Sequence, residues 1–366
     1  MARRGMYAAL RERLARADEQ GKFLVPMSRA DARCLNKAVK RGDLISPAQG
    51  VYLTADMWQC KKPTDRSLAI ARSLQELHPT WVFCGVTAAL AYGMAVSFSL
   101  TDYVHRAVSR KTHTNPYGAR GVVRHVVSED SIVEVSGIRV TSIERTVFDC
   151  LRSLGFREGL AIVDSTLQRK LVTAEALSSE FASYSPAFFG RSRAIETLAW
   201  ADGRAESGGE SVARAVMIER GFRLPELQHE VPDPVGVGEG YRVDFFWELA
   251  GQRNVIGELD GREKYLNPQM TGGRSAVDVL ADERLRESRV SGSDAKVMRF
   301  SFSQVMDRTF FTRLLCAYGI PRDAEIPWVA LRDDDPEAHL SRPERLFLGR
   351  WLPYAERHGL PMPCVA

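Results

Sequence analysis

Acidic side chains and one lysine between residues 210 and 264 have the types and spacing of a site for phosphodiester chemistry. Glu210 lies in an expected helix, Asp244 in the next-but-one element, and Glu258 and Asp260 at the end of the following strand, with Lys264 shortly after. Carboxylate oxygens are the ligands that hard divalent cations prefer. We therefore expect Asp244 and Glu258 to share Mg²⁺ or Mn²⁺, with Glu210 completing the shell directly or through water. Lys264 would orient the attacking water or stabilise the developing negative charge.

These side chains need a framework that brings two strand ends together beside a helix. Residues 201–208 are polar and contain glycine, which is typical of a linker. After them the pattern predicts an α-β-β-β-α-β order. The expected elements are a helix over 210–220, strands over 227–231, 241–249 and 255–259, a helix over 277–289 and a strand over 296–300.

This element order, with Arg-Val-Asp-Phe over 242–245 and Glu-Leu-Asp-Gly over 258–261, resembles the core of the PD-(D/E)XK, or restriction-endonuclease-like, superfamily. Over about residues 207–318 it is similar to the very-short-patch-repair-endonuclease-like branch, which implies a metal-dependent nuclease domain over 201–320. Where the superfamily pattern has a lysine, this chain has Asp260, and Lys264 or Arg262 would take the lysine's place. The alternative is a nuclease-like domain that serves only as a binding scaffold.

The composition indicates a multidomain α/β protein. The chain has 366 residues, more than one ordinary domain, with 45% hydrophobic and 26% charged residues. Its six cysteines include no Cys-x-x-Cys pair, which argues against a zinc ribbon or a disulfide framework. No apolar segment typical of a signal peptide or a membrane span is visible, so we expect a cytoplasmic protein with no membrane partner.

Positive charge is concentrated near the N-terminus. Residues 1–66 hold 14 Lys or Arg against 7 Asp or Glu, a net charge of +7, which leaves −3 for the rest of a chain whose net charge is +4. Apolar spacing predicts a helix over 6–19, a second helix capped by Ser28, and a basic segment over 33–41 that continues this helix or forms the next one. Segments 44–46 and 51–53 predict a small hairpin.

This order is that of a winged helix-turn-helix over residues 1–62. The basic helix would enter the major groove of duplex DNA, and the hairpin wing would touch the backbone or the minor groove. Basic side chains off the apolar stripe of the helix would contact phosphates. These are Arg33, Lys37, Lys40 and Arg41. A protein-interaction module of the same shape, or a solvated basic face, is the alternative.

Residues 63–200 predict a middle α/β domain, joined to the first through a linker over 61–65. Helices are expected over 66–76, 86–92, 142–154 and 158–170, with strands over 103–108, 122–127 and 138–141. Arg145 and Asp149 have the spacing of a helical ion pair. His105 and His125 lie in expected strands without a carboxylate pattern nearby, and we expect them to be structural.

Three segments of this half of the chain resemble the AbiEi family of antitoxin-like proteins from type IV toxin–antitoxin systems. They are Gly-Val-Tyr over 50–52, Thr-Ala-Ala-Leu-Ala-Tyr-Gly over 87–93, and the run from Gly-Ile-Arg-Val-Thr-Ser to Asp over 137–149. The resemblance covers about residues 20–180. It implies a DNA-binding winged helix and an α/β domain used for dimerisation and toxin antagonism, so a cognate toxin and a second copy of the chain are candidate partners.

Two functions follow from these patterns. The first is a DNA-binding protein of toxin–antitoxin or phage-defence type that also hydrolyses phosphodiesters. The alternative is a non-enzymatic antitoxin-like transcriptional regulator, in which the nuclease-like domain is only a scaffold. Residues 321–366 predict a tail with a short helix over 344–351, and they add no recognisable chemistry.

Overall fold

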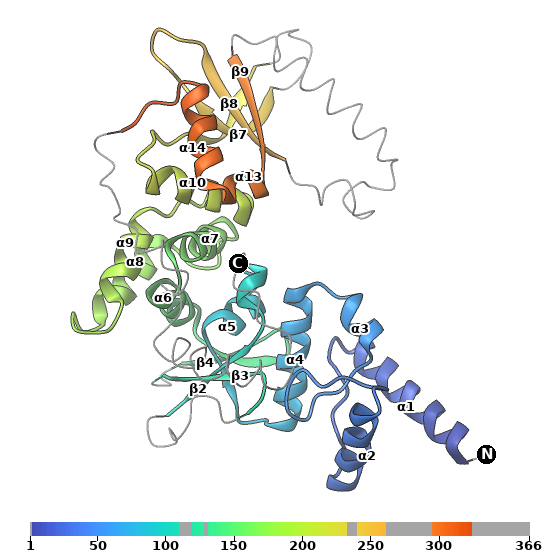
Figure 1. Cartoon of the computed structure of the whole chain (residues 1–366). Helices are drawn as coiled ribbons and strands as arrows, with labels where there is room; N and C mark the ends of the chain where they lie inside the picture. The colour runs from blue at the N-terminus through green and yellow to red at the C-terminus, as the bar shows by residue number, and fades with distance from the viewer. Residues whose placement is uncertain (1, 110–118, 128–130, 233–239, 261–294, 324–366) are drawn as a thin grey trace.

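The computed structural model describes residues 2–109, 119–127, 131–232, 240–260 and 295–323. Within these ranges the chain has two sheets, and each sheet contains both parallel and antiparallel strand pairs. Figure 1 shows the N-terminal helices at one end and the four-stranded sheet at the other. Between the two sheets lie α7 (Phe156–Gln168) and α10 (Gly208–Glu219). The expected mixed α/β class is confirmed.

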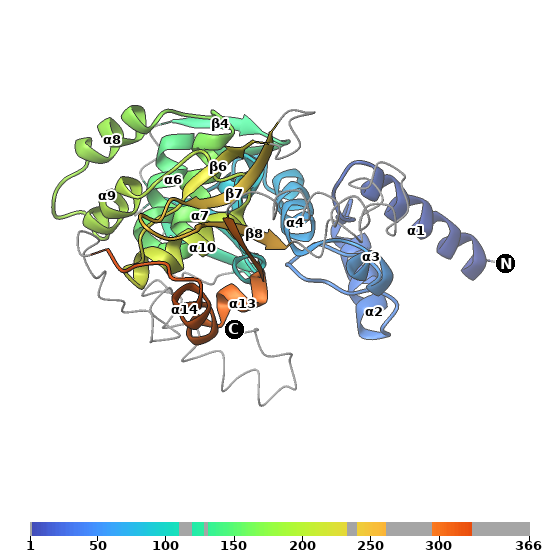
Figure 2. The same ribbon diagram turned by 90° about the horizontal axis from the view of Figure 1, so that it is seen from above.

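Helices dominate the N-terminal region: α1 (Ala2–Glu19), α2 (Arg29–Lys40) and the short α3 (Ala55–Gln59). Figure 2 shows α1 extending away from the rest of the chain. Ser28 starts α2, because its backbone is extended and its hydroxyl accepts the N–H of Asp31, a donor that the first turn leaves unpaired. Between Ser28 and Arg41 there is one helix, so the basic segment continues the helix that Ser28 caps.

The predicted hairpin forms through the isolated antiparallel bridge of Ile45 with Leu53, and Leu24 adds a bridge to Tyr52 from outside it. Its loop does not project into solvent as a wing would. Ala48 in this loop is fully buried, and the N–H of the next residue, Gln49, donates to a backbone carbonyl of the middle region at 3.2 Å. The apolar residues of this loop therefore complete a core shared with the middle region, while Gln49 stays exposed. Contact of the hairpin with DNA stays a prediction.

The boundary expected after residue 62 is not a linker. There α4 (Pro63–Leu77) begins directly, with proline in the first turn, where its missing N–H costs nothing. Phe23 and Val51 from the N-terminal region pack in one apolar cluster with Leu74 of α4 and Val140 of the middle sheet. Because both regions contribute to one core, they are parts of a single packed body.

The middle sheet has the strand order β3-β2-β1-β5-β4. Its strands are β1 (Val82–Phe83), β2 (Val104–Val108), β3 (Val122–Val126), β4 (Ile132–Val135) and β5 (Ile138–Thr141). Ser136 and Gly137 join the last two strands, with φ angles of 54° and 80° that suit a two-residue hairpin turn. The sequence did not indicate β4, because this edge strand buries no apolar side chain fully and so lacks a clear alternation.

Helices cover this sheet and extend from it. They are α5 (Gly85–Ala91), α6 (Ile143–Ser153), α7, α8 (Ala174–Ser183) and α9 (Arg191–Ala199), with a short 3₁₀ turn η1 (Phe98–Leu100). The expected helices at α4, α5, α6 and α7 are confirmed. The last two helices, α8 and α9, pack against α6 through a shared apolar cluster that includes Phe148 and Phe181.

The buried helix α10 belongs to two hydrophobic cores. Ala215 and Ile218 pack with the middle helices, whereas Ala213 and Met217 pack with the C-terminal sheet. The preceding segment over 201–208 is not a free linker, since Ala205 within it is buried and the N–H of Asp202 bonds to Asp164 of α7. That prediction was wrong because polar composition is shared by linkers and by segments whose polar groups bond internally.

The C-terminal sheet has the order β6-β7-β8-β9, in which β9 runs parallel to β8 and the other neighbours are antiparallel. Its strands are β6 (Glu226–Val231), β7 (Tyr241–Trp247), β8 (Asn254–Asp260) and β9 (Ala295–Ser301), followed by α13 (Phe302–Met306) and α14 (Arg308–Ala317). The expected first helix and four strands are confirmed. The helix expected over 277–289 and the tail helix over 344–351 lie outside the described residues.

Among the helices of the described ranges, none combines the length and the apolar character required to cross a bilayer.

Candidate functional site

Glu210 is held in the first turn of α10 by hydrogen bonds to both carboxylate oxygens. Ser207 is the N-cap of the helix, and its hydroxyl accepts the N–H of Glu210 at 3.2 Å and bonds to Oε1 at 2.7 Å. Oε2 accepts the N–H of Glu206 at 2.9 Å. The positive end of the helix dipole also favours a carboxylate here. Glu210 therefore stabilises the start of the helix, a role that the sequence pattern did not indicate.

Gln228 connects this carboxylate to the sheet, and reasoning from the sequence missed it. Its Nε2 donates to Glu210 Oε2 at 3.0 Å. Gln228 has a φ of 54°, which is uncommon for a residue other than glycine, and it falls between the β6–β7 pairs Leu227–Phe245 and His229–Val243. A glutamine in a strand does not by itself indicate a site residue. Its bond to the helix depends on the positive φ at this position, which the sequence does not predict.

Asp244 and Glu258 lie on adjacent antiparallel strands. The observed pair Phe245–Gly257 sets a register in which the next pair is Asp244 with Glu258. Both side chains are partly buried. Oδ2 of Asp244 accepts the N–H of Leu259 at 2.9 Å, which fixes this carboxylate beside the end of β8. Directly opposed side chains on such strands lie close enough to interact, so the expectation that these two acids meet is supported by the register.

The remaining predicted residues lie at or beyond the end of β8. Asp260 is exposed and stands opposite Ser301 of β9, while Glu258 stands opposite Arg299 in the same register. Asp260 is thus at the edge of the site and not among its buried groups. Lys264 and Arg262, expected to supply the positive charge, lie outside the described residues.

The acidic groups repel one another. Burial is the largest cause of a raised pKa at Glu210, and the charge of Asp244 adds to it, while hydrogen bonds from Ser207 and Glu206 act in the opposite direction. Carboxylates in such a setting favour a proton or a cation. Within the described ranges, however, no three His, Cys, Asp or Glu side chains gather closely enough to hold a metal ion. Asp244 thus neighbours Glu258 through the strand register and acts on the charge of Glu210, but the three acids do not form a closed ligand shell.

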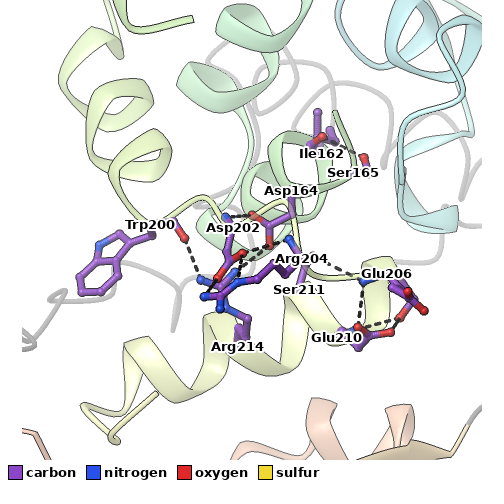
Figure 3. Close-up of polar contacts among 11 residues, drawn as sticks. Ile162, Asp164, Ser165, Trp200, Asp202, Arg204, Glu206, Glu210, Ser211 and Arg214 are labelled. Atoms are coloured by element: carbon purple, nitrogen blue, oxygen red, sulfur yellow. Dashed lines mark hydrogen bonds and ion pairs between the residues drawn. The ribbon is translucent and has the colours of Figure 1, made fainter. Parts of the chain in front are cut away.

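Buried ion pairs fix α10 to the middle of the chain. Figure 3 shows Arg214 of α10 directed at Asp164 of α7, with an Nη1–Oδ2 distance of 2.8 Å. Oδ1 of Asp164 accepts the N–H of Asp202 at 2.7 Å, and burial raises the pKa of Asp164 to about 6 against the opposing charge of Arg214. A second pair joins Arg157 of α7 to Glu219, with Nε 2.9 Å from each carboxylate oxygen. The helix that carries the acidic site is therefore anchored at two points.

The basic side chains of α2 form a separate, exposed face. All four predicted residues are exposed: Arg33, Lys37, Lys40 and Arg41. The first three are spaced at i, i+4 and i+7, which places them on one side of the helix. Arg41 is the C-cap and pairs with Asp43 at 2.8 Å. The structure thus brings the predicted nucleic-acid-binding residues together on a solvent-facing surface.

Two sets of polar side chains in the middle region bond to one another, as we expected for structural residues. Arg145 and Asp149 are buried, with an Nε–Oδ2 distance of 2.9 Å, and Arg152 bonds the other oxygen of Asp149 at 2.7 Å. His105 and His125 stack on the neighbouring strands β2 and β3, with Nδ1 and Nε2 2.8 Å apart. The first group lies within α6, and the second joins β2 to β3.

Comparison with known proteins leaves the function open. No family model matches the chain, and no solved structure matches it. Two uncharacterized proteins from two strains of Mycobacterium tuberculosis are each 33% identical to the chain over 166 residues. The alignment covers 45% of this chain and 58% of each relative, so the similarity is confined to part of both proteins.

Proposed function

We propose that the chain is a DNA-binding protein of toxin–antitoxin or phage-defence type whose C-terminal region hydrolyses phosphodiesters with Mg²⁺ or Mn²⁺. The observation that carries this proposal is the β7–β8 register, whose last pair is Phe245 with Gly257 and which, continued by one residue, sets Asp244 opposite Glu258. Burial and the charge of Asp244 both raise the pKa of Glu210, so a third carboxylate lies within electrostatic reach. Mutual repulsion of this kind is relieved by a hard divalent cation.

In this proposal each acidic residue has a distinct task. Asp244 and Glu258 hold the cation, and Glu210 orients the ligand shell directly or through water. When bound, the ion would polarise the phosphate and lower the pKa of a ligated water. Asp260 occupies the position at which the PD-(D/E)XK pattern has a lysine, and we assign to Lys264 the stabilisation of the developing negative charge. Gln228 keeps the Glu210 carboxylate aimed at the sheet.

The N-terminal region supplies affinity for the substrate in the same proposal. Its partner is duplex DNA, whose phosphates the exposed side chains of α2 would neutralise. A cognate toxin and a second copy of the chain are the partners that the AbiEi resemblance implies for residues 63–200. The β-sheet and helices of that region leave the α2 face exposed, which is compatible with simultaneous binding of DNA and protein.

Metal binding and cleavage can be tested on one matched pair of variants. We expect Asp244→Asn to weaken Mn²⁺ binding in calorimetric titration by more than about tenfold, and to abolish nicking of supercoiled plasmid. Glu248→Gln removes an exposed acid just beyond β7 and should leave both properties unchanged. Wild-type protein that cuts no DNA or RNA substrate with either metal would exclude the enzymatic function.

A second candidate is a non-enzymatic regulator that binds its own promoter. It is favoured by the hydrogen bonds that occupy both oxygens of Glu210, and by the lack of a three-acid cluster among the described residues. Both candidates require the basic face of α2. Replacing its four predicted residues with alanine should lower the slope of log affinity against log salt by about 3 to 4. Unchanged affinity in that quadruple variant would show that DNA binds elsewhere.

A further inference from the structure

The loop expected to act as a wing is covered by a turn from the middle region. Gly121 approaches it so closely that a Cβ at this position would lie 2.7 Å from the carbonyl oxygen of Pro47. Its φ of 77° is also one that glycine adopts without strain. The carbonyl of Arg120 accepts the N–H of Gln49 at 3.2 Å. The turn over 119–121 and the loop therefore form one continuous backbone surface.

Arg120 lies on the outside of this turn. Its side chain is exposed, and Nη2 donates to Ser46 Oγ at 2.6 Å. The Ser46 hydroxyl in turn donates to the carbonyl of Ala48 at 3.0 Å, so the acceptor is itself held in place. One of the five N–H donors of a guanidinium is used by this bond. The charge is thus oriented by the protein, and its other donors are compatible with an external anion.

The position of Arg120 is tied to α2 through Tyr52. The Tyr52 hydroxyl donates to Asn36 Oδ1 at 3.0 Å, and Asn36 is an exposed residue of α2 between Arg33 and Lys40. Burial raises the pKa of Tyr52, and the positive charge of Arg120 opposes this rise. Tyr52 follows the loop in which Ser46 and Gln49 bond to Arg120. The hairpin therefore connects Arg120 to the side of α2 on which Asn36 lies.

We propose that Arg120 extends the basic face of α2 and contacts a phosphate of the same DNA duplex, so that the 119–121 turn replaces the covered wing. This inference rests on the proposed DNA binding by α2. Two acids near this face are already paired, Asp43 with Arg41 and Asp31 with Arg13. What remains is positive charge on two rigidly joined elements, which fits a stiff polyanion with regularly spaced phosphates.

The test is a salt titration of binding to a fluorescently labelled duplex, followed by anisotropy. We expect Arg120→Gln to lower the slope of log affinity against log salt by about 1, and to weaken binding about fivefold to tenfold at 0.1 M salt. Lys170→Gln removes one exposed charge beyond the end of α7 and should bind as the wild type does. Arg120→Lys, which keeps the charge, should retain most of the slope, and it also serves as the folded variant if the glutamine variant does not fold.

Ser46→Ala separates a structural role of Arg120 from a phosphate contact. It removes the hydrogen bond to the guanidinium without changing the net charge, so the salt slope should stay at the wild-type value. If Ser46→Ala and Arg120→Gln reduce the slope equally, or if Arg120→Gln leaves it unchanged while the quadruple α2 variant loses binding, the inference about Arg120 is overturned and DNA binding by α2 stands. Wild-type protein that binds an acidic polypeptide but no duplex would overturn both.

Discussion

The two surfaces that could act on nucleic acid are built in opposite ways. The basic side chains of α2 are exposed, and the ion pair between Arg41 and Asp43 lies on the surface. Glu210 is 5% exposed and bonded through both oxygens, on a helix that two buried ion pairs anchor. Substituting the charged residues of α2 should have little effect on the stability of the fold, whereas substituting those of α10 should lower it. Binding and stability are therefore separable at α2 and coupled at α10.

The largest expected effect is at the anchored end of α10. Glu219 is fully buried against Arg157, so Glu219→Ala leaves a buried guanidinium without its partner. We expect the free energy of unfolding, measured by urea titration, to fall by about 3–5 kcal/mol. Replacing both residues with methionine should recover most of the loss, because a buried pair can be exchanged for apolar side chains. Lys37→Ala on α2 should change the same quantity by less than about 0.5 kcal/mol, and similar losses in both variants would contradict the contrast.

A smaller effect is expected at Glu210 itself. Glu210→Ala removes the acceptor of the Glu206 N–H and of the Gln228 amide, and should lower the free energy of unfolding by about 1–3 kcal/mol. Glu210→Gln keeps one oxygen acceptor and should cost less. Calorimetric Mn²⁺ titration of the glutamine variant then separates the two roles. Unchanged metal affinity would show that Glu210 acts in the fold and not in the ligand shell.

The pH dependence of stability should reveal the same burial. The folded-state pKa of Glu210 is raised above its usual value of 4.5, mainly by burial. Between 4.5 and the folded pKa, the native protein keeps a proton that the unfolded chain has released, so this contribution falls as pH rises through that window. The free energy of unfolding of wild type relative to Glu210→Gln should thus be most favourable below about pH 4.5 and decline as pH rises through the folded-state pKa. A difference that grows with pH would refute the assignment.

The smallest expected effect on stability lies on the α2 side. Asp43 and Arg41 form an exposed ion pair, with 39% and 52% of their side-chain surfaces accessible. Asp43→Ala should therefore change the free energy of unfolding by less than about 0.5 kcal/mol. The same change removes a negative charge next to the basic face, and affinity for a DNA duplex should rise about twofold to fivefold at low salt. An unchanged or weaker affinity would place the DNA away from the C-terminal end of α2.

Local patterns sufficed for much of the fold. The apolar alternation around Asp244 and Glu258 predicted β7 and β8 to within two residues at each end, and the Ser28 cap located the start of α2. Charge and spacing also predicted which side chains of α2 face solvent. These features depend on period and capping, which neighbouring residues determine.

The contacts between regions could not be predicted in this way. The polar segment over 201–208 has the composition of a linker, yet Asp202 within it bonds to Asp164, 38 residues earlier in the chain. Arg214, which follows the segment, bonds to the same carboxylate across 50 residues. The position of Gln228 depends on a positive φ in β6. The position of Arg120 depends on a turn that packs on a loop about 70 residues earlier in the chain. Such placements follow from how complete elements pack, and single-residue propensities carry no record of them.

The double membership of α10 also limits how the protein can be divided. A fragment that begins with this helix would carry Ala215 and Ile218 into water, while a fragment that ends before it would leave an open cavity over α7. Either piece would tend to aggregate or to refold around the missing surface. Separate expression of the two halves is therefore a poor assay of what each one does, and point substitutions in the intact chain are the informative perturbation.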